Sequence, residues 1–441
     1  MFQDTIAAIA TGDTMSAISV IRISGDDALA ITGRLMKQDV SDVKGYTLKY
    51  GTLYDQDEPV DEVLVSFFRA PRSYTGEDIA EINCHGGVYL TRRILQLILG
   101  QGARLARPGE FTQRAFLNGK MDLSQAEGIN DLIFARDDVN ARSALHSLKG
   151  SVRSVLEPLR EELIQIIANI EVNIDYPEYE DVHVLTEEEI LPAVHKWQND
   201  IAVLIRNAQD AVFIREGIDT VILGRPNVGK SSLLNALLEE DKAIVTDIAG
   251  TTRDIVEGTI RLEGVTLNLI DTAGIHETDD VVEKIGIERS IQAMDRAALV
   301  IVVLDGSEEL TESDRDLLER TKDKTRIVVY NKKDIREIPD AVSISAANRD
   351  VDALKKRILE IYDREISHAH QDTLNNERQI GLAIQAQQAM NDAAGALDMG
   401  MELDLVTIDL QRAYDALMEI TGEHTKEGLL DEIFSRFCLG K

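Results

Sequence analysis

Four short motifs follow one another in a fixed order in the middle of the chain. They are Gly-Arg-Pro-Asn-Val-Gly-Lys-Ser at 224–231, Asp-Thr-Ala-Gly at 271–274, Asn-Lys-Lys-Asp at 331–334 and Ser-Ala at 345–346. Continuous apolar runs precede the first three motifs, as is typical of strands buried on both faces of a parallel sheet. Because open α/β sheets bind ligands at the carboxyl ends of their strands, the motifs predict one ligand site at one edge of such a sheet.

The first motif fits the GxxxxGK[ST] pattern of a phosphate-binding loop. Its glycines let the backbone wrap around phosphate groups, and the N–H groups at the start of the following helix face negative charge. Lys230 is expected to reach the β- and γ-phosphates, while the Ser231 hydroxyl, and Asp271 through water, bind Mg²⁺. Asp334 can accept two hydrogen bonds from the N1–H and N2–H₂ edge of guanine, which adenine cannot supply. The sequence therefore predicts a guanine-nucleotide domain.

A polar segment at 246–254 lies between the first two motifs. A threonine in this position usually closes over the γ-phosphate and Mg²⁺ as part of a switch segment. Either Thr251 or Thr252 could bind the ion, and we favour Thr252. The complete set of residues predicted to contact GTP is Asn227, Val228, Gly229, Lys230, Ser231, Ser232, Thr246, Asp247, Ile248, Ala249, Gly250, Thr251, Thr252, Asp271, Thr272, Ala273, Gly274, Asn331, Lys332, Lys333, Asp334, Ser345, Ala346 and Ala347.

Ile275 directly follows the second motif, where many small GTPases have a glutamine that orients the attacking water. An isoleucine cannot do this, so another group must assist hydrolysis. Glu283 is the best local candidate to position the water. The alternative, a solvated carboxylate in an acidic run, fits the sequence equally well.

A monovalent cation is the second predicted aid to hydrolysis. We predict that K⁺ binds beside the nucleotide and offsets the charge that develops between the β- and γ-phosphates. Asn227 would offer a side-chain oxygen, with Thr246, Ile248 and Thr251 completing the shell around the ion.

Six further motifs lie outside the nucleotide domain: 20–25, 74–78, 85–87, 107–112, 115–123 and the C-terminal Phe-Cys-Leu-Gly-Lys at 437–441. With these and the nucleotide motifs, the chain closely resembles the bacterial tRNA-modification GTPases of the MnmE family, also called TrmE, over essentially its whole length. Two departures are visible. The glycine- and proline-rich stretch that the family often has reads here as Gly-Asp-Thr-Met-Ser-Ala at 12–17, and the C-terminus reads Cys-Leu-Gly-Lys where Cys-Ile-Gly-Lys is usual.

The resemblance implies a second site in the N-terminal region. In the family, this region binds a one-carbon derivative of tetrahydrofolate, either the 5-formyl or the methylene form, and mediates homodimerisation. Carried over by position, Arg22, Glu81, Lys120 and Lys441 would contact the folate, and Cys438 would take part in the modification reaction. A cysteine so close to a chain end could instead lie in a frayed tail with an ordinary thiol. The helical apolar pattern at 429–437 favours a docked segment and some nucleophilic character.

The implied activity is the addition of a carboxymethylaminomethyl or aminomethyl group at C5 of the wobble uridine of certain tRNAs. The resemblance further implies a heterotetramer with an FAD- and NADH-dependent protein similar to MnmG. Nothing in this chain resembles a dinucleotide site, so the FAD is expected on that partner. Two alternatives remain open: a ribosome-assembly GTPase, and a folate enzyme in which the GTPase is a regulatory insertion.

The apolar patterns predict a multidomain α/β and α protein. Residues 1–119 read as an α+β domain, and residues 120–213 with 369–441 as one helical domain that contains an inserted Ras-like P-loop GTPase domain at 214–368. A long amphipathic helix is predicted from 145 to 170, with Pro158 expected to kink it or to begin a new segment. The apolar positions that define this helix are Leu145, Leu148, Val152, Leu156, Leu159, Leu163, Ile166 and Ile170.

Composition limits the partners and the compartment. The formal net charge of −31 means that any tRNA contact depends on local basic patches or on the partner protein. The two cysteines, Cys84 and Cys438, fit a reducing cytosol. No apolar run approaches the roughly 18 residues of a membrane helix, and the N-terminus lacks the pattern of a signal peptide. We therefore expect a cytoplasmic protein that does not contact a membrane.

Overall fold

The computed structural model describes residues 4–135, 137–175, 187–240, 256–262, 264–270, 294–369, 371–424, 427–438 and 440. The chain divides into two compact units, one of Met1–Asn199 with Gly381–Lys441 and the other of Asp200–Ile380. Both borders fall within helices, α7 (Glu187–Glu216) and α14 (Glu377–Asp398). The finer division with borders at 119, 213 and 368 stays a prediction.

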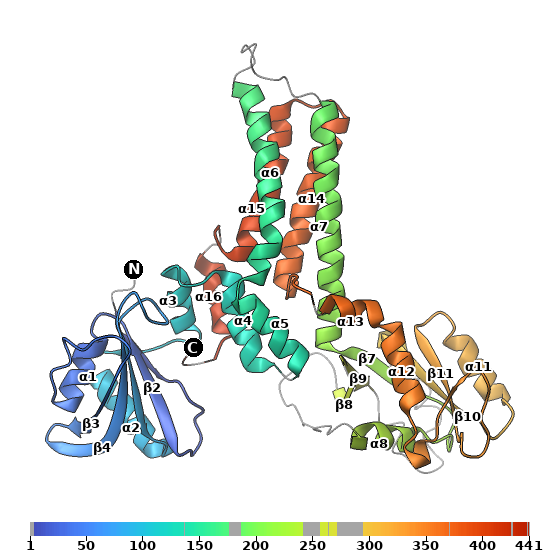
Figure 1. Cartoon of the computed structure of the whole chain (residues 1–441), viewed down its shortest axis with the longest axis horizontal. Helices are drawn as coiled ribbons and strands as arrows, with labels where there is room; N and C mark the ends of the chain where they lie inside the picture. The colour runs from blue at the N-terminus through green and yellow to red at the C-terminus, as the bar shows by residue number, and fades with distance from the viewer. Residues whose placement is uncertain are drawn as a thin grey trace. The chain divides into compact units, whose positions relative to one another are not determined.

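The N-terminal region forms a mixed sheet with the strand order β3-β4-β5-β2-β1-β6 (Figure 1). One face of the sheet packs against two helices, with Ile21, Val65 and Ile94 among the core residues. On the opposite face, Phe111 contacts Ile6 of the first strand. The strands are β1 (Ile6–Ile9), β2 (Ile18–Ser24), β3 (Thr47–Asp55), β4 (Glu58–Phe68), β5 (Ile79–His85) and β6 (Arg104–Leu105), and the helices are α1 (Ala28–Met36), α2 (Val88–Gly100) and α3 (Glu110–Leu117).

The rest of this unit is helical. Figure 1 shows α6, α14, α15 and the first part of α7 side by side. The fully buried Trp197 of α7 donates a hydrogen bond from Nε1 to the carbonyl of Leu159, and the half-buried Gln198 donates to Asn391 of α14. The additional helices are α4 (Leu123–Phe134), α5 (Asp138–Leu148), α6 (Ser151–Asp175), α15 (Leu403–Thr421) and α16 (Glu427–Ser435).

The predicted single helix over 145–170 is wrong, because two helices, α5 and α6, cover this stretch. Of the two alternatives predicted for Pro158, a new segment does not begin there. Pro158 lies inside α6. The helical structure is interrupted earlier in the sequence, at Gly150 between α5 and α6. Gly150 has a φ of 87°, a left-handed conformation that ends a helix and that glycine adopts without steric cost.

The second unit contains a sheet with the strand order β12-β11-β10-β7-β9-β8, in which all pairs are parallel except β8 with β9. Strand β10 is buried at every position, as its continuous apolar run 299–304 requires of a strand covered on both faces. The strands are β7 (Ile218–Leu223), β8 (Val256–Leu262), β9 (Val265–Ile270), β10 (Leu299–Asp305), β11 (Arg326–Asn331) and β12 (Val342–Ser343). The helices are α8 (Lys230–Glu240), α11 (Glu312–Arg320), η1 (Ala346–Asn348), α12 (Asp352–Ile361) and α13 (Asp363–Ala369). This parallel sheet, the α+β region and the helical region confirm the predicted fold class.

In the described part of the chain, no helix combines the length and the apolar character that crossing a membrane requires.

Candidate functional site

The phosphate-binding loop connects the buried strand β7 to the start of α8, as predicted. The ammonium group of Lys230 donates hydrogen bonds to the carbonyl oxygens of Gly224 and Arg225, at 2.8 and 2.9 Å. Burial lowers the pKa of Lys230, because the charged form loses hydration. The lysine therefore lies across the loop with its charge directed at the backbone that would surround the phosphates.

Asn331, the last residue of β11, joins three of the predicted motifs. Its Nδ2 donates to the carbonyl of Val228 at 2.9 Å, and its Oδ1 accepts from the backbone N–H of Ala346 at 3.0 Å. Gly229 lies against the same amide, since a Cβ atom at Gly229 would be 2.2 Å from Nδ2 of Asn331. The ends of β7, β11 and β12 thus meet at one edge of the sheet, through a contact too close for any side chain at Gly229.

Asp334 is held next to the Ser345–Ala346 motif. Its Oδ1 accepts a hydrogen bond from the Ser345 hydroxyl at 2.5 Å. Lys333 turns away from this contact and pairs with Asp350 at 3.2 Å. Asp334, predicted to recognise the base, and Ala346, predicted to contact GTP, therefore belong to one connected group of side chains and backbone.

Asp305 was not predicted as a site residue. It is buried at the end of β10 and pairs with Lys332 at 2.5 Å, while its other oxygen accepts from the hydroxyl and backbone N–H of Ser307. Burial acts to raise the pKa of Asp305, but the bonds from Lys332 and Ser307 outweigh it and hold the pKa below the ordinary value. The carboxylate is thus charged and orients the Lys332 side chain. The sequence signal that could have identified Asp305 is an acidic residue at the end of a wholly apolar strand.

Arg225, a variable position within the phosphate-binding loop pattern, also has an unpredicted partner. Its Nε donates to the buried carboxylate of Asp314 at 2.8 Å. Asp314 also completes the capping box of α11 with Thr311. The loop is therefore fixed to the start of a neighbouring helix.

The remaining predicted nucleotide residues fall into two groups. Ser231 and Ser232 lie in the first turn of α8, and Ala347 lies in η1. The segments 246–252 and 271–274, with Ile275 and Glu283, lie outside the described residues, so their predicted roles stay predictions.

The second predicted site lies on the face of the N-terminal sheet opposite α1 and α2. Arg22 of β2 and Glu81 of β5 are cross-strand partners, and Nε of Arg22 donates to Oε1 of Glu81 at 2.8 Å. The guanidinium carbon of Arg22 is 5.2 Å from the ring centroid of Tyr74 and 5.5 Å from that of Phe111. Arginine, carboxylate and two aromatic rings thus lie together on one face.

The C-terminal segment reaches this group of residues. The carbonyl oxygen of Gly440 accepts a hydrogen bond from Arg22 at 3.2 Å, and the Cys438 carbonyl oxygen accepts from the N–H of Gly109 at 3.4 Å. Phe434 and Phe437 are buried, so the segment is docked as the apolar pattern predicted. Cys438 is half-buried, and Lys441 lies outside the described residues.

Lys120 lies near the same face but makes a different contact. Its ammonium group is exposed and donates to the carbonyl of Pro71 at 2.8 Å. Pro71 lies in the same loop, 69–78, as Tyr74, so Lys120 and Arg22 contact this loop at different points. No direct contact between Arg22 and Lys120 is recorded among the described residues.

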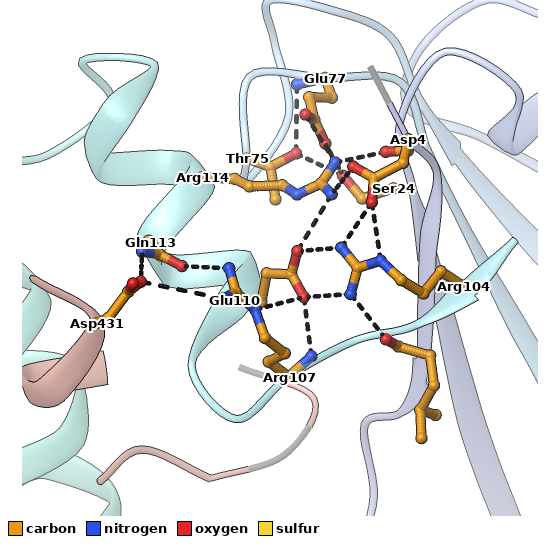
Figure 2. Close-up of polar contacts among 11 residues, drawn as sticks. Asp4, Ser24, Thr75, Glu77, Arg104, Arg107, Glu110, Gln113, Arg114 and Asp431 are labelled. Atoms are coloured by element: carbon orange, nitrogen blue, oxygen red, sulfur yellow. Dashed lines mark hydrogen bonds and ion pairs between the residues drawn. The ribbon is translucent and has the colours of Figure 1, made fainter. Parts of the chain in front are cut away.

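A buried network of charges supports this site (Figure 2). Arg114 of α3 is fully buried and pairs with Asp4, Glu77 and Glu110 at 2.8, 3.1 and 3.2 Å. Burial acts to raise the pKa of Glu110, but the bonds from Arg104 and the backbone N–H of Arg107 hold the pKa below its ordinary value. Removing one partner of such a buried pair costs about 3–5 kcal/mol, whereas the intact pair contributes little net stability. The network therefore fixes geometry more than it adds stability.

The nucleotide unit combines a phosphate-binding loop, a lysine across it, and an Asn-Lys-Lys-Asp segment joined to that loop by Asn331. These features define a P-loop GTPase. The family model described as "GTP-binding protein TrmE N-terminus" matches residues 5–120, and the model described as "MnmE helical domain" matches residues 123–438. The chain belongs to the MnmE (TrmE) family of GTPases.

Individual relatives agree with this assignment. The tRNA modification GTPase MnmE of Bacillus mycoides is 46% identical over 455 residues, covering 99% of this chain and 99% of the relative. That of Levilactobacillus brevis is 47% identical over 456 residues, covering 99% and 98%. Among solved structures, the G domain of the T. maritima FeoB iron transporter is 27% identical and covers 33% of this chain and 99% of that one. Its TM-score of 0.25 is too low to establish a shared fold.

Proposed function

We propose that this GTPase adds a carboxymethylaminomethyl or aminomethyl group at C5 of the wobble uridine of certain tRNAs. It acts with an FAD-dependent partner similar to MnmG, which supplies the flavin chemistry, and works in the cytoplasm where tRNA is modified. The observation that carries the proposal is that one chain combines a GTPase site with a second site at Arg22, Glu81 and Gly440. A ribosome-assembly GTPase needs no such second site.

The chemistry of the second site fits a one-carbon tetrahydrofolate. Arg22, with Lys120 on the neighbouring loop and Lys441, suits the anionic glutamate tail, because charge-assisted hydrogen bonds are the strong ones. The carboxylate of Glu81 can accept from the donor edge of a pterin. The rings of Tyr74 and Phe111 offer apolar surface against the flat heterocycle. Cys438, on the segment that reaches Arg22, is proposed as a participant in the reaction.

The same face of the sheet supports homodimerisation. The cross-strand register places Leu48, Tyr50 and Leu64 on the face that carries Arg22 and Glu81. Each of these three large side chains is exposed. Apolar side chains gathered beside a polar site are typical of an interaction surface, and we propose that a second copy of the chain covers them.

A deletion strain tests the proposed function. We expect digested tRNA from this strain to lack the C5 modification at the wobble uridine, measured by mass analysis of nucleosides. Re-expression of the native chain should restore it, and Lys230→Ala, which removes the charge across the phosphate-binding loop, should not. Unaltered wobble uridines together with accumulated ribosomal-subunit precursors would favour the ribosome-assembly alternative instead.

Hydrolysis is proposed to need two cations. Ser231 and Thr252 would hold Mg²⁺ against the phosphates, and K⁺ would bind at Asn227 with Thr246, Ile248 and Thr251. Asn227 supports this role because it is exposed within the loop, where its φ of 65° turns the backbone sharply. K⁺ would offset the charge that develops between the β- and γ-phosphates, and Glu283 would orient the attacking water.

The GTP turnover rate should therefore depend on the monovalent cation. At fixed ionic strength we expect roughly 10-fold or faster turnover in K⁺ or Rb⁺ than in Na⁺, since a shell shaped for the larger ion cannot close around the smaller one. Asn227→Ala should lose this difference. The matched control is Asn235→Ala, which changes an exposed asparagine on α8 and should keep the difference between K⁺ and Na⁺.

Two outcomes would count against these roles. Equal GTP turnover rates of the native protein in K⁺ and Na⁺ would exclude the cation role. A fully active Glu283→Ala variant would show that Glu283 is a solvated carboxylate that hydrolysis does not need.

A further inference from the structure

Helix α3 is fixed firmly on the side that faces the sheet (Figure 2). Its Glu110 and Arg114 side chains are fully buried. They pair with each other and with Arg104, Asp4 and Glu77. Since the network contacts the start of β1, strand β6 and the 74–77 loop, α3 cannot shift without breaking buried ion pairs.

The same helix shapes the surroundings of Arg22. The Thr112 hydroxyl lies 2.8 Å from the Tyr74 hydroxyl, and the Phe111 ring lies 5.5 Å from the Arg22 guanidinium. Arg114 also pairs with Glu77 of the loop that carries Tyr74. The position of α3 therefore sets the position of both rings beside Arg22.

The start and outer side of α3 contact the C-terminal region. A Cβ atom at Gly109 would lie 2.4 Å from the Phe434 carbonyl oxygen, so α3 and α16 meet too closely for a side chain there. The side-chain amide of Gln113 donates to Oδ1 of Asp431 at 2.9 Å. Gln113 is buried, whereas the Asp431 side chain is 60% exposed. This hydrogen bond ties α16 to the fixed helix just before the segment with Cys438 and Gly440.

We propose that Gln113 and Asp431 are positioning residues that couple the docking of the 438–440 segment to ligand binding at Arg22. The inference rests on the folate site proposed above. Arg22 contacts both the ring of Tyr74 and the carbonyl of Gly440, so a ligand held there favours the docked segment. By thermodynamic linkage, a ligand that favours the docked segment binds more weakly when that segment is loosened.

Asp431→Lys in the full-length chain tests the coupling. A lysine there faces Arg107, whose guanidinium is 4.0 Å from Asp431. It also cannot accept the hydrogen bond from Gln113. We expect the rate of Cys438 alkylation by iodoacetamide to rise, and the affinity for 5-formyltetrahydrofolate to fall, each by about 5-fold or more. Cys84, the other cysteine, is only 3% exposed and should react slowly.

Two further variants separate positioning from a general loss of structure. Glu432→Lys makes the same charge change on the next residue of α16, whose carboxylate pairs with Arg436 just beyond the end of the helix. It should leave both measurements near the native values. Adding Gln113→Glu to Asp431→Lys supplies a new ion pair at the same contact and should recover both.

The outcomes decide the proposal. Equal alkylation rates and affinities for Asp431→Lys and Glu432→Lys, or failure of the double variant to recover, would overturn it. Absence of 5-formyltetrahydrofolate binding to the native protein would instead overturn the folate assignment. In that case the alkylation rates would still decide whether Asp431 docks the segment.

Discussion

Replacing Asp334 with asparagine should lower the affinity for GTP by roughly 100-fold or more and raise that for xanthosine triphosphate (XTP). The carboxylate can accept from both N1–H and N2–H₂ of guanine, whereas an asparagine amide would direct its own N–H₂ at the guanine amino group. Two donors would then face each other, leaving polar groups unpaired, which is the costly arrangement. Xanthine has a carbonyl at that position and can accept from the amide. Titration of the native and variant proteins with GTP and with XTP measures the change in both affinities.

The control for this variant is Asp350→Asn. Asp350 is a neighbouring carboxylate that pairs with Lys333 rather than facing the predicted base position. Its substitution should leave the ratio of GTP to XTP affinity close to the native value. An Asp334→Asn protein with native GTP affinity would show that another residue recognises the base.

Gly229→Ala should reduce guanine-nucleotide affinity by roughly 100-fold or more. Gly229 has a φ of 98°, which an alanine adopts only with strain, and the added Cβ would lie 2.2 Å from Nδ2 of Asn331. The Asn331 amide would have to move, losing its hydrogen bonds to Val228 and Ala346. The loop and the base-binding segments would then separate. Titration with a fluorescent GDP analogue would measure the loss.

Gly258→Ala provides the comparison within the same sheet. A Cβ at Gly258 would lie 3.6 Å from Cδ1 of Leu269, which is an ordinary packing distance. This variant should bind nucleotide with close to native affinity. Similar affinities for the two alanine variants would contradict the role of the Gly229–Asn331 contact.

Motif spacing predicted that separate motifs meet at one edge of a parallel sheet, because backbone geometry dictates this arrangement. A phosphate-binding loop needs glycines at fixed offsets, and parallel strands bring separate motifs to one edge of a sheet. Asn331 and Ala346 accordingly lie with Val228 of the phosphate-binding loop at one edge of the sheet, whereas their contacts with a nucleotide stay predictions. The partner of Lys332 was missed because Asp305 lies 27 residues away in sequence, and no local pattern links the two.

The helical region shows a different limit of sequence reasoning. Apolar residues continue at intervals of three to four across Lys149 and Gly150, although α6 buries these positions and α5 leaves Leu145 exposed. Periodicity therefore predicted one helix where there are two. A kink or a new segment was predicted at Pro158, whereas the two helices are separated at Gly150, where φ is positive.

The contact between Arg22 and Gly440 has a consequence for biosynthesis. The two residues are separated by 418 positions. During translation, the N-terminal sheet and the GTPase can fold as soon as each has left the ribosome. The Arg22 site is complete only after residue 440 has been synthesised and its carbonyl has bonded to Arg22 of strand β2. A prematurely terminated chain would thus hold a GTPase without a finished second site.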